Sequence, residues 1–194
     1  GRASQALGQQ AQPALGYLTG GTETNTEFLA RKIVVNAHAG NDVTALINAL
    51  IANENVDGGF SNQAGDTSSV LDTAYALEAL AVANYTSGTL VSSAVGYLLS
   101  QQTGSGGWGD GANDPSVFVS AQAMRALWFY RSIYQGVTSA LTSAQNFVLS
   151  RRGINGLWGE DFETALAFNC HRTERDGSLA DRGRCHGAAI RPAG

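Results

Sequence analysis

Apolar residues recur at helical spacing in three similar stretches of the chain. Leucine, isoleucine, valine and tyrosine stand at i, i+3 and i+4 over residues 42–54, 89–102 and 138–152. This spacing is typical of amphipathic helices, each with one buried stripe. Two further helices are predicted over residues 3–18 and 25–38. No alternating β pattern interrupts them, so the sequence predicts an all-α protein without strands.

A second kind of segment is apolar on most sides. Residues 69–82 contain only two charged side chains, Asp72 and Glu78. A helix of this composition must be covered on most sides, so we expect it in an inner layer with the more polar helices outside. A similar helix is predicted to begin at Asp114, because an N-cap residue followed by proline is a common helix start.

The two kinds of segment alternate because the sequence repeats itself. A shift of 50 residues places residues 91–110 on 141–160, with serine, alanine, leucine, glycine and tryptophan matched identically. A shift of 48 residues places 43–60 on the first of these segments, so that Phe60 falls under Trp108. Self-similarity at a fixed period is the signature of a repeat architecture.

Each unit therefore consists of an outer helix, a glycine-rich loop and an inner helix. The inner segments repeat too, since residues 73–80 match 120–127, and residues 164–165 begin a third copy. A helix loses about 1 kcal/mol for each glycine inside it, so the loops should end the outer helices. Residues 1–168 are thus predicted to form three to four helical hairpins, the last ending in a stub at 161–168.

Every loop ends in a glycine followed, two residues later, by an aromatic residue. Residues 102–108 read Gln-Thr-Gly-Ser-Gly-Gly-Trp, and two related loops replace the glutamine by an acidic or a basic residue. The residues of this structural motif are Glu54, Gly58, Phe60, Gln102, Gly106, Trp108, Arg152, Gly156 and Trp158.

This loop resembles the Gln-x-x-x-Gly-x-Trp (QW) motif of squalene–hopene and oxidosqualene cyclases. The sequences of residues 57–60, 68–74 and 98–102 are most similar to the prenyltransferase and squalene-oxidase-type repeats of large secreted bacterial proteins. The resemblance covers about residues 1–168. It implies an α/α toroid, here a partial barrel of three to four hairpins, in which the glutamine and the aromatic ring clasp each joint.

The catalytic acid of that family is missing from this chain. Terpene cyclases of this type take a proton donor from Asp-x-Asp-Asp-Thr-Ala, and the matching residues 69–74 place Ser69 and Leu71 at two of the acidic positions. Because leucine cannot donate a proton, we expect a non-catalytic domain used for binding or scaffolding. The resemblance to the repeats of large secreted bacterial proteins implies that this domain belongs to a larger bacterial extracytoplasmic or secreted protein. The alternative is a fragment of an isoprenoid cyclase or prenyltransferase-type enzyme whose catalytic acids lie outside this chain.

One acidic position recurs on the inner helices. Asp72 and Glu163 each precede a threonine, Asn25 falls near the same position in the first repeat, and Val119 occupies it in the third. Carboxylates arranged in this way could form a polar floor for a ligand or a metal. The other interpretation is that an acid in the first turn is favoured by the positive end of the helix dipole.

Aromatic residues supply the other candidate ligand contacts. Tyr75 lies on the inner helix after Asp72, and Trp128 begins a cluster with Phe129, Tyr130 and Tyr134. The cluster could line a cavity suited to cations or hydrophobic molecules. Alternatively, it packs between hairpins.

Composition changes near residue 169. The only cysteines and two of the three histidines follow it, as Cys170, His171, Cys185 and His186. They are candidate zinc ligands or a disulfide pair, but no Cys-x2-Cys or His-x3-His spacing accompanies them. Residues 169–194 lack an apolar period, so this tail is interpreted as foreign to the repeat: a disordered extension, a cloning remnant or an out-of-frame translation.

Charge and hydropathy limit the partners. The 194-residue chain has a net charge of −4, with 43% hydrophobic and 14% charged residues. The absence of a basic patch argues against nucleic acid, and no apolar run approaches the roughly 20 residues of a membrane span. We expect no cofactor, a protein or a hydrophobic small molecule as partner, and self-association through open repeat ends. Because the chain starts at Gly1 rather than Met, further N-terminal sequence is expected.

Overall fold

The computed structural model describes residues 22–111 and 114–158. These contain helices α2 (Thr26–His38), α3 (Thr44–Ile51), α4 (Val70–Val82), α5 (Thr89–Ser100), α6 (Val117–Trp128) and α7 (Val137–Ser150), and strands β1 (Phe60–Ser61) and β2 (Ser68–Ser69). The protein is mostly helical, as the spacing of apolar residues predicts. The predicted helix at 3–18, the stub at 161–168 and the tail 169–194 lie outside the described residues. Within the described ranges, no helix combines the length and apolarity needed to cross a membrane.

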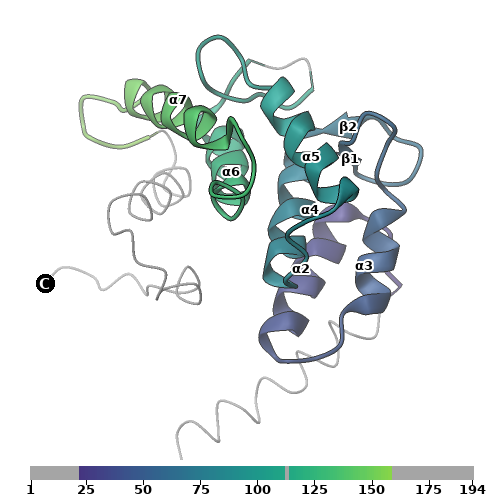
Figure 1. Ribbon diagram of the computed structural model, residues 1–194. Coiled ribbons are helices and arrows are strands. Elements are labelled where there is room, and N and C mark those ends of the chain that lie inside the picture. Colours follow the sequence, from purple (N-terminus) through teal and green to yellow (C-terminus); the bar gives the residue numbers. More distant parts are fainter. Residues whose placement is uncertain (1–21, 112–113, 159–194) are drawn as a thin grey trace, which may run out of the picture.

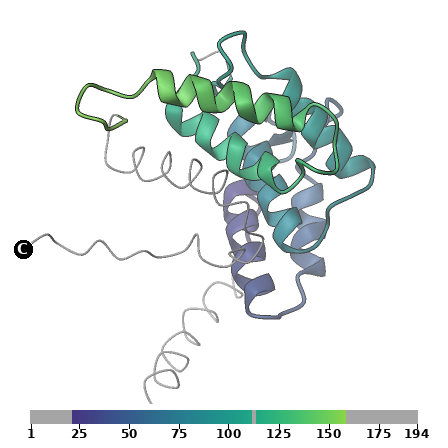
Figure 2. The same cartoon turned by 60° about the vertical axis from the view of Figure 1, so that its left-hand side comes forward.

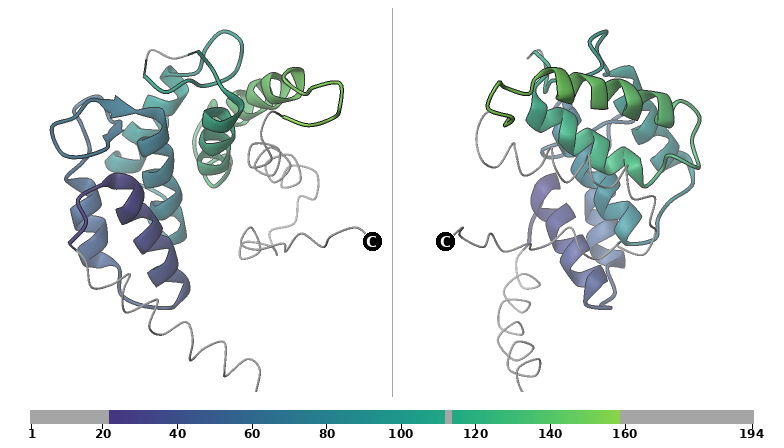
Figure 3. Two further views of the ribbon diagram at one scale, coloured as in Figure 1. Left: turned by 180° about the vertical axis from the view of Figure 1, so that it is seen from behind. Right: turned by 90° about the vertical axis from the view of Figure 1, so that its left-hand side faces the viewer.

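The helices pack as two layers. Helix α4 lies between α2 and α6 and packs against both, while α3, α5 and α7 pack against α2, α4 and α6 in turn. Figure 1 shows the α6–α7 pair on one side of α4 and α5 and the α2–α3 pair on the other, and the view from behind in Figure 3 agrees. Figure 2 shows α6 and α7 side by side along their length. The core is aliphatic, and Leu77 and Leu80 of α4 are completely buried.

The inner helices α2, α4 and α6 begin in the same way. Their N-caps are Asn25, Ser69 and Ser116, and each side-chain oxygen accepts a hydrogen bond from the backbone N–H three residues on, at 3.2, 3.0 and 3.1 Å. Such a cap satisfies a backbone donor that the first turn leaves without a partner. The prediction that α6 begins at Asp114 is therefore wrong, because Ser116 supplies the cap. Residues equally distant from the three caps occupy equivalent positions.

The β1–β2 pair contradicts the prediction that the chain contains no strand. Phe60 pairs with Ser69 in a short antiparallel ladder. In the next repeat, Trp108 forms an isolated antiparallel bridge with Ser116. In both repeats the aromatic residue of the loop thus pairs with the N-cap of the following helix. A ladder of two residue pairs is too short to produce an alternating pattern in the sequence.

Helix α3 is shorter than the predicted 42–54. At its start, the carboxylate of Asp42 accepts hydrogen bonds from the backbone N–H and the hydroxyl of Thr44, at 2.9 and 2.6 Å. At its end, Asn53 N and Glu54 N donate to carbonyls three residues earlier, at 3.0 Å each. These turns replace helical hydrogen bonds at both ends of the predicted segment.

Candidate functional site

The three glycine–aromatic loops have the same backbone conformation. They are here named the first corner (54–60), the second corner (102–108) and the third corner (152–158). In each, the second residue donates its N–H to the carbonyl of the sixth, at 2.8, 3.0 and 2.8 Å. The fifth residue is a glycine with φ of +82°, +89° and +80° in Gly58, Gly106 and Gly156. Because these angles are strained for residues with a Cβ, the loop requires glycine at this place.

The aromatic ring of each corner is buried at the joint with the outer helix. The indole N–H of Trp108 donates to the carbonyl of Leu98 at 2.7 Å, and that of Trp158 donates to Val148 at 2.6 Å. Both acceptors lie ten residues before the tryptophan, near the end of the outer helix. Phe60 is completely buried too but has no donor for this bond. The two tryptophan rings are therefore bonded to the ends of the outer helices that precede them.

Backbone groups of the first two corners are tied to the following inner helix. Trp108 N donates to Ser120 Oγ at 2.9 Å, and Phe60 N donates to Thr73 Oγ1 at 2.8 Å. Ser120 and Thr73 are completely buried. A small hydroxyl side chain on the inner helix thus satisfies a buried backbone donor at each joint.

The first residue of the corner varies, and its contacts vary with it. Gln102 Nε2 donates to the carbonyls of Gly106 and Ala140, both at 2.8 Å, and so links the second corner to α7. Arg152 Nε donates to Gly156 O at 2.8 Å, and within the part of the chain that the structure describes it has no bond of the second type. An ionised Glu54 cannot donate at all, and burial raises the pKa of this carboxyl. Of the three corners, the second is the one whose first residue is bonded both to its own loop and to the next outer helix.

The first and second corners also pack on the next outer helix. A Cβ added to Gly58 would lie 2.8 Å from the carbonyl oxygen of Ser93 in α5, and one added to Gly106 would lie 2.5 Å from that of Ser143 in α7. Ser93 and Ser143 are equivalent under the 50-residue repeat. A shallow polar depression of about 250 Å3 lies between the second corner and α7, with Ser143 and Asn146 in its lining.

The glycine after each of these two contacts faces an aromatic ring of the same outer helix. A Cβ on Gly59 would lie 2.8 Å from the ring of Tyr97, and one on Gly107 would lie 2.6 Å from the ring of Phe147. Tyr97 and Phe147 are again equivalent under the repeat. The two joints are therefore built from a glycine hole in the corner and an aromatic knob on the helix.

The inner helices carry a row of polar and aromatic side chains, here named the inner face, and all but one of them are at least partly exposed. Its members lie at the same few distances from the caps of α2, α4 and α6. The inner face consists of Arg31, Tyr75, Glu78, Gln122, Arg125 and Trp128. Arg31, Tyr75 and Gln122 each lie six residues after a cap, and Glu78 and Arg125 each lie nine residues after one.

Contacts on the inner face join adjacent helices at equivalent positions. The Arg31 guanidinium lies 5.5 Å from the centre of the Tyr75 ring, and Glu27 binds this arginine through Nη2 at 2.5 Å. Burial raises the pKa of Tyr75, and the Glu27 carboxylate adds to the rise. Glu78 of α4 forms an ion pair with Arg125 of α6, whose Nε lies 3.2 Å from Glu78 Oε2.

One buried polar atom of the inner face has no partner among the described residues. Gln122 is 8% exposed, and its Oε1 makes no hydrogen bond there. A buried acceptor without a partner is unfavourable by about 1–3 kcal/mol, so a donor that reached this oxygen would be bound favourably. Gln122 follows Tyr75 in the row of equivalent positions.

Asp72 lies in the first turn of α4 and is hydrogen-bonded to the N-cap residue of this helix. Its carboxylate accepts a hydrogen bond from Ser69 Oγ at 2.8 Å while its backbone N–H donates to the same hydroxyl at 3.0 Å. Asp110 accepts from the neighbouring Leu71 N at 3.4 Å. Burial raises the pKa of Asp72; the Ser69 hydrogen bond opposes this shift and the charge of Asp110 adds to it. This geometry fits the helix-dipole interpretation of the acid.

The described helices do not bring carboxylates together at the position of Asp72. The positions equivalent to Asp72 hold Phe28 on α2 and Val119 on α6. Asn25 does not share this position, because it is the N-cap three residues earlier. Glu163 lies outside the described residues.

The aromatic cluster at the end of α6 is largely used for packing. Tyr130 is completely buried and donates its hydroxyl to Leu77 O of α4 at 2.7 Å, and burial raises its pKa. The Tyr134 ring lies 6.1 Å from that of Tyr130. Trp128 is half-buried and lies under the guanidinium of Arg131, 3.9 Å from its ring centre. Only Trp128 therefore extends the inner face.

The candidate zinc ligands Cys170, His171, Cys185 and His186 lie outside the described residues. Within residues 22–111 and 114–158, no group of three or more His, Cys, Asp or Glu side chains could hold a metal ion.

Sequence reasoning missed most of the inner face. Arg31, Gln122 and the Glu78–Arg125 pair were not among the candidate residues, although a 47-residue shift places Glu78 under Arg125. Opposite charges at one repeat position on adjacent inner helices could have predicted the ion pair.

No protein-family model matches this sequence, and no curated protein is significantly similar to it. Any function must therefore be inferred from the corners and the inner face.

Proposed function

We propose that residues 1–168 belong to a non-catalytic α/α toroid-type repeat domain of the terpene cyclase and prenyltransferase kind, which binds a partner within a larger bacterial extracytoplasmic protein. The observation that supports this is the contrast within each repeat. The backbone conformation is the same in all three corners, whereas the inner face presents a different side chain at each equivalent position. A constant frame with a variable surface is how repeat proteins build binding sites.

The chemistry of the inner face suits a mainly hydrophobic partner with one hydrogen-bond donor. Tyr75 and Trp128 offer aromatic surface, and the nearby Arg31 is already engaged by Glu27 and by the Tyr75 ring. Gln122 Oε1 offers a buried acceptor. A hydrophobic small molecule that carries a hydroxyl group, or an apolar protein segment with a similar donor, would satisfy both features.

The surroundings of Asp72 support a domain without catalysis. A carboxyl whose pKa is raised is a weaker acid than an ordinary aspartic acid, whereas protonation of an alkene requires a stronger one. The Ser69 hydroxyl also occupies one oxygen of this carboxylate. Leu71 stands where the family places its proton donor.

Binding is tested with farnesol, a hydrophobic alcohol, as the probe. We expect farnesol to raise the melting temperature of the full chain in a concentration-dependent way, because a ligand that binds only the native state stabilises it. Gln122→Leu should reduce the rise, while Val56→Ser at the exposed tip of the first corner should leave it unchanged. An equal response of all three proteins would place binding elsewhere.

Catalysis is tested separately by incubating the chain with squalene and with farnesyl diphosphate and analysing the products. The proposal predicts no turnover. Product formation that is abolished by Asp72→Asn would instead support the alternative, an isoprenoid cyclase or prenyltransferase-type enzyme. An Asp-x-Asp-Asp sequence upstream in the complete reading frame would favour the same alternative.

A further inference from the structure

The third corner does not show the packing of the other two. The three described atoms nearest the Cβ position of Gly156 all belong to the side chain of Arg152, whereas the backbone of an outer helix is among the nearest neighbours of Gly58 and Gly106. Leu157 stands where the other corners have their second glycine, and it is 40% exposed. The third corner therefore presents an apolar knob where the first and second corners present a hole.

Helix α3 has small side chains at the two positions through which the other outer helices contact a corner. Leu50 lies ten residues before Phe60 and is thus equivalent to the indole acceptors Leu98 and Val148. In this register, Ala45 and Ala49 occupy the positions of the serine and the aromatic ring that receive a corner in α5 and α7. Both alanines are exposed. Helix α3 therefore presents a hole where α5 and α7 present a knob.

The charges at the same joint are complementary. In the second corner, Gln102 Nε2 binds the carbonyl of Ala140. The third corner has Arg152 in place of this glutamine, and the residue of the α3 segment in register with Ala140 is Asp42. Asp42 is exposed and lies two residues before the first residue of α3. A docked third corner would thus bring a guanidinium beside a carboxylate.

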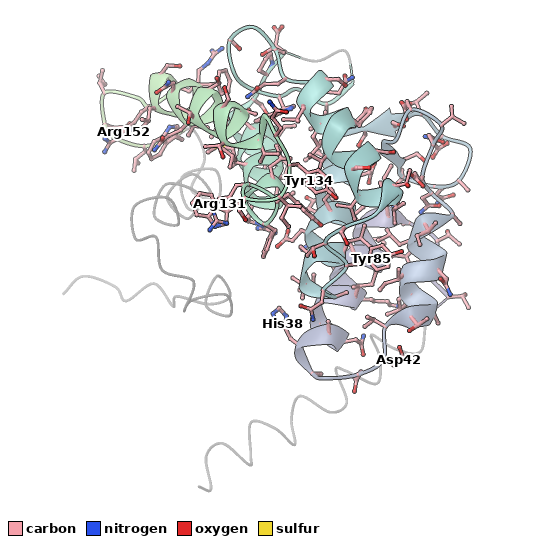
Figure 4. The ribbon with its side chains drawn as sticks, viewed as in Figure 1. His38, Asp42, Tyr85, Arg131, Tyr134 and Arg152 are labelled. Carbon is pink, nitrogen blue, oxygen red and sulfur yellow. The ribbon has the colours of Figure 1, made fainter. Side chains whose placement is uncertain are left out.

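The two surfaces cannot meet within one chain. Figure 4 shows Arg152 in the loop beyond α7 and Asp42 beside the start of α3, on opposite sides of the molecule. We propose that the third corner of one copy docks on α3 of a second copy, head to tail, with Leu157 on Ala49 and Arg152 beside Asp42. This interface repeats the internal corner-to-helix joint with knob and hole exchanged.

The proposal goes beyond the function proposed above, because it requires no ligand and no inner-face residue. It depends on the corner geometry and on the repeat register alone. A head-to-tail contact uses two different surfaces of each copy, so it generates a ring if the rotation closes and a longer chain if it does not.

A charge exchange tests the polar part of the interface by sedimentation equilibrium of the full chain over a range of concentrations. Arg152→Asp and Asp42→Arg each place like charges together, so each should weaken association about tenfold or more. The double variant Arg152→Asp/Asp42→Arg should recover it. Arg151→Asp is the matched control: it changes the same charge one residue away, where the guanidinium lies 5.0 Å from the Phe147 ring, and should leave association near the wild-type value.

A size exchange tests the apolar part without changing charge. Ala49→Tyr fills the hole on α3 and should weaken association about tenfold or more, because it clashes with Leu157. Adding Leu157→Gly recreates the glycine–tyrosine pair of Gly59 and Tyr97 and should restore association. Circular dichroism melting curves of every variant check that the fold is retained.

Two results would overturn the proposal. One is a wild-type chain that stays monomeric at all concentrations. The other is association that neither exchange affects in folded variants, or that Arg151→Asp weakens as much as Arg152→Asp does. Loss of self-association would not alter the farnesol response, so failure of this proposal and failure of the binding function are distinguishable.

Discussion

The corners and the inner face follow the same repeat, but equivalent positions hold the same residue in the corners and different residues on the inner face. At the corner, Gly58, Gly106 and Gly156 occupy one position with nearly the same positive φ. On the inner face, Arg31 and Tyr75 occupy equivalent positions and have little chemistry in common. The difference arises because the corner is fixed by backbone angles and backbone hydrogen bonds, whereas inner-face side chains meet mostly one another. Inner-face residues can therefore change without loss of the corner structure, so binding specificity can develop at these positions.

The largest effect should come from breaking a corner at its glycine. Gly106→Ala adds a Cβ 2.5 Å from a backbone oxygen of α7 at a residue with φ of +89°. Strain at positive φ and overpacking should together lower the free energy of unfolding by about 3 kcal/mol or more. Urea denaturation measures the change.

Two matched glycines separate the causes of that loss. Gly104→Ala lies in the same loop, without positive φ and with open space around it, and should be nearly neutral. Gly156→Ala keeps the strain of positive φ, but the described atoms nearest its Cβ belong to the flexible side chain of Arg152, so it should be intermediate. If Gly106→Ala were as mild as Gly104→Ala, the corner would not be the rigid frame described above.

A smaller effect should come from trimming a ring. Trp108→Phe removes the indole hydrogen bond to Leu98 O and part of a completely buried ring. We expect a loss of about 2 kcal/mol, from a buried acceptor left without its donor and from the space that remains. Trp128→Phe on the inner face is the control, and because that ring is half-buried the loss should stay below about 1 kcal/mol. Equal losses, measured by denaturation, would remove the distinction between frame and surface.

An ion-pair exchange examines the inner face itself. Glu78 and Arg125 join α4 to α6 with both side chains partly exposed. In a double-mutant cycle with Glu78→Gln and Arg125→Gln, the coupling should be about 1 kcal/mol or less and should fall in 1 M NaCl, because solvent and salt screen such pairs. The reversed pair Glu78→Arg/Arg125→Glu should retain much of it. A coupling that does not change with salt would contradict a charge-based contact.

The sequence predicted the parts of the fold that rest on helical periodicity and on glycine. The segments α4, α5 and α7 lie within one or two residues of their predicted bounds. Helix α3 was predicted too long because apolar spacing continues through residues 42–54. The hydrogen bonds of Asp42 make the helix begin later than predicted, and that of Glu54 N makes it end earlier. Strand β1 was missed because a two-residue strand has no period.

The candidate site was predicted less well, for a physical reason. Corner residues depend on local backbone geometry, which a short motif such as residues 102–108 encodes. Inner-face contacts such as that between Arg31 and Tyr75 depend on which helices become neighbours and in what register. The register follows from the caps Asn25 and Ser69, and neither cap was identified from the sequence.

The smallest predicted effect concerns Asp72, which belongs to the inner helix but acts at its capped end. Because burial raises its pKa in the folded state above the ordinary value, the folded chain binds this proton more tightly than the unfolded chain does. The protonated form therefore contributes its full stabilisation below the pKa that Asp72 has in the unfolded chain. This stabilisation is lost as pH rises through the higher pKa of the folded chain, so the free energy of unfolding falls between the two values. Asp72→Asn should abolish that fall while changing stability at pH 7 by only about 0.5 kcal/mol, because relief of burial opposes the loss of a charge at the helix N-terminus. Denaturation of both proteins between pH 3.5 and 7 measures the difference in slope. A wild-type chain in which Asp72 makes stability rise over this window would mean that its hydrogen bond to Ser69 outweighs the effect of burial, and would contradict the raised pKa.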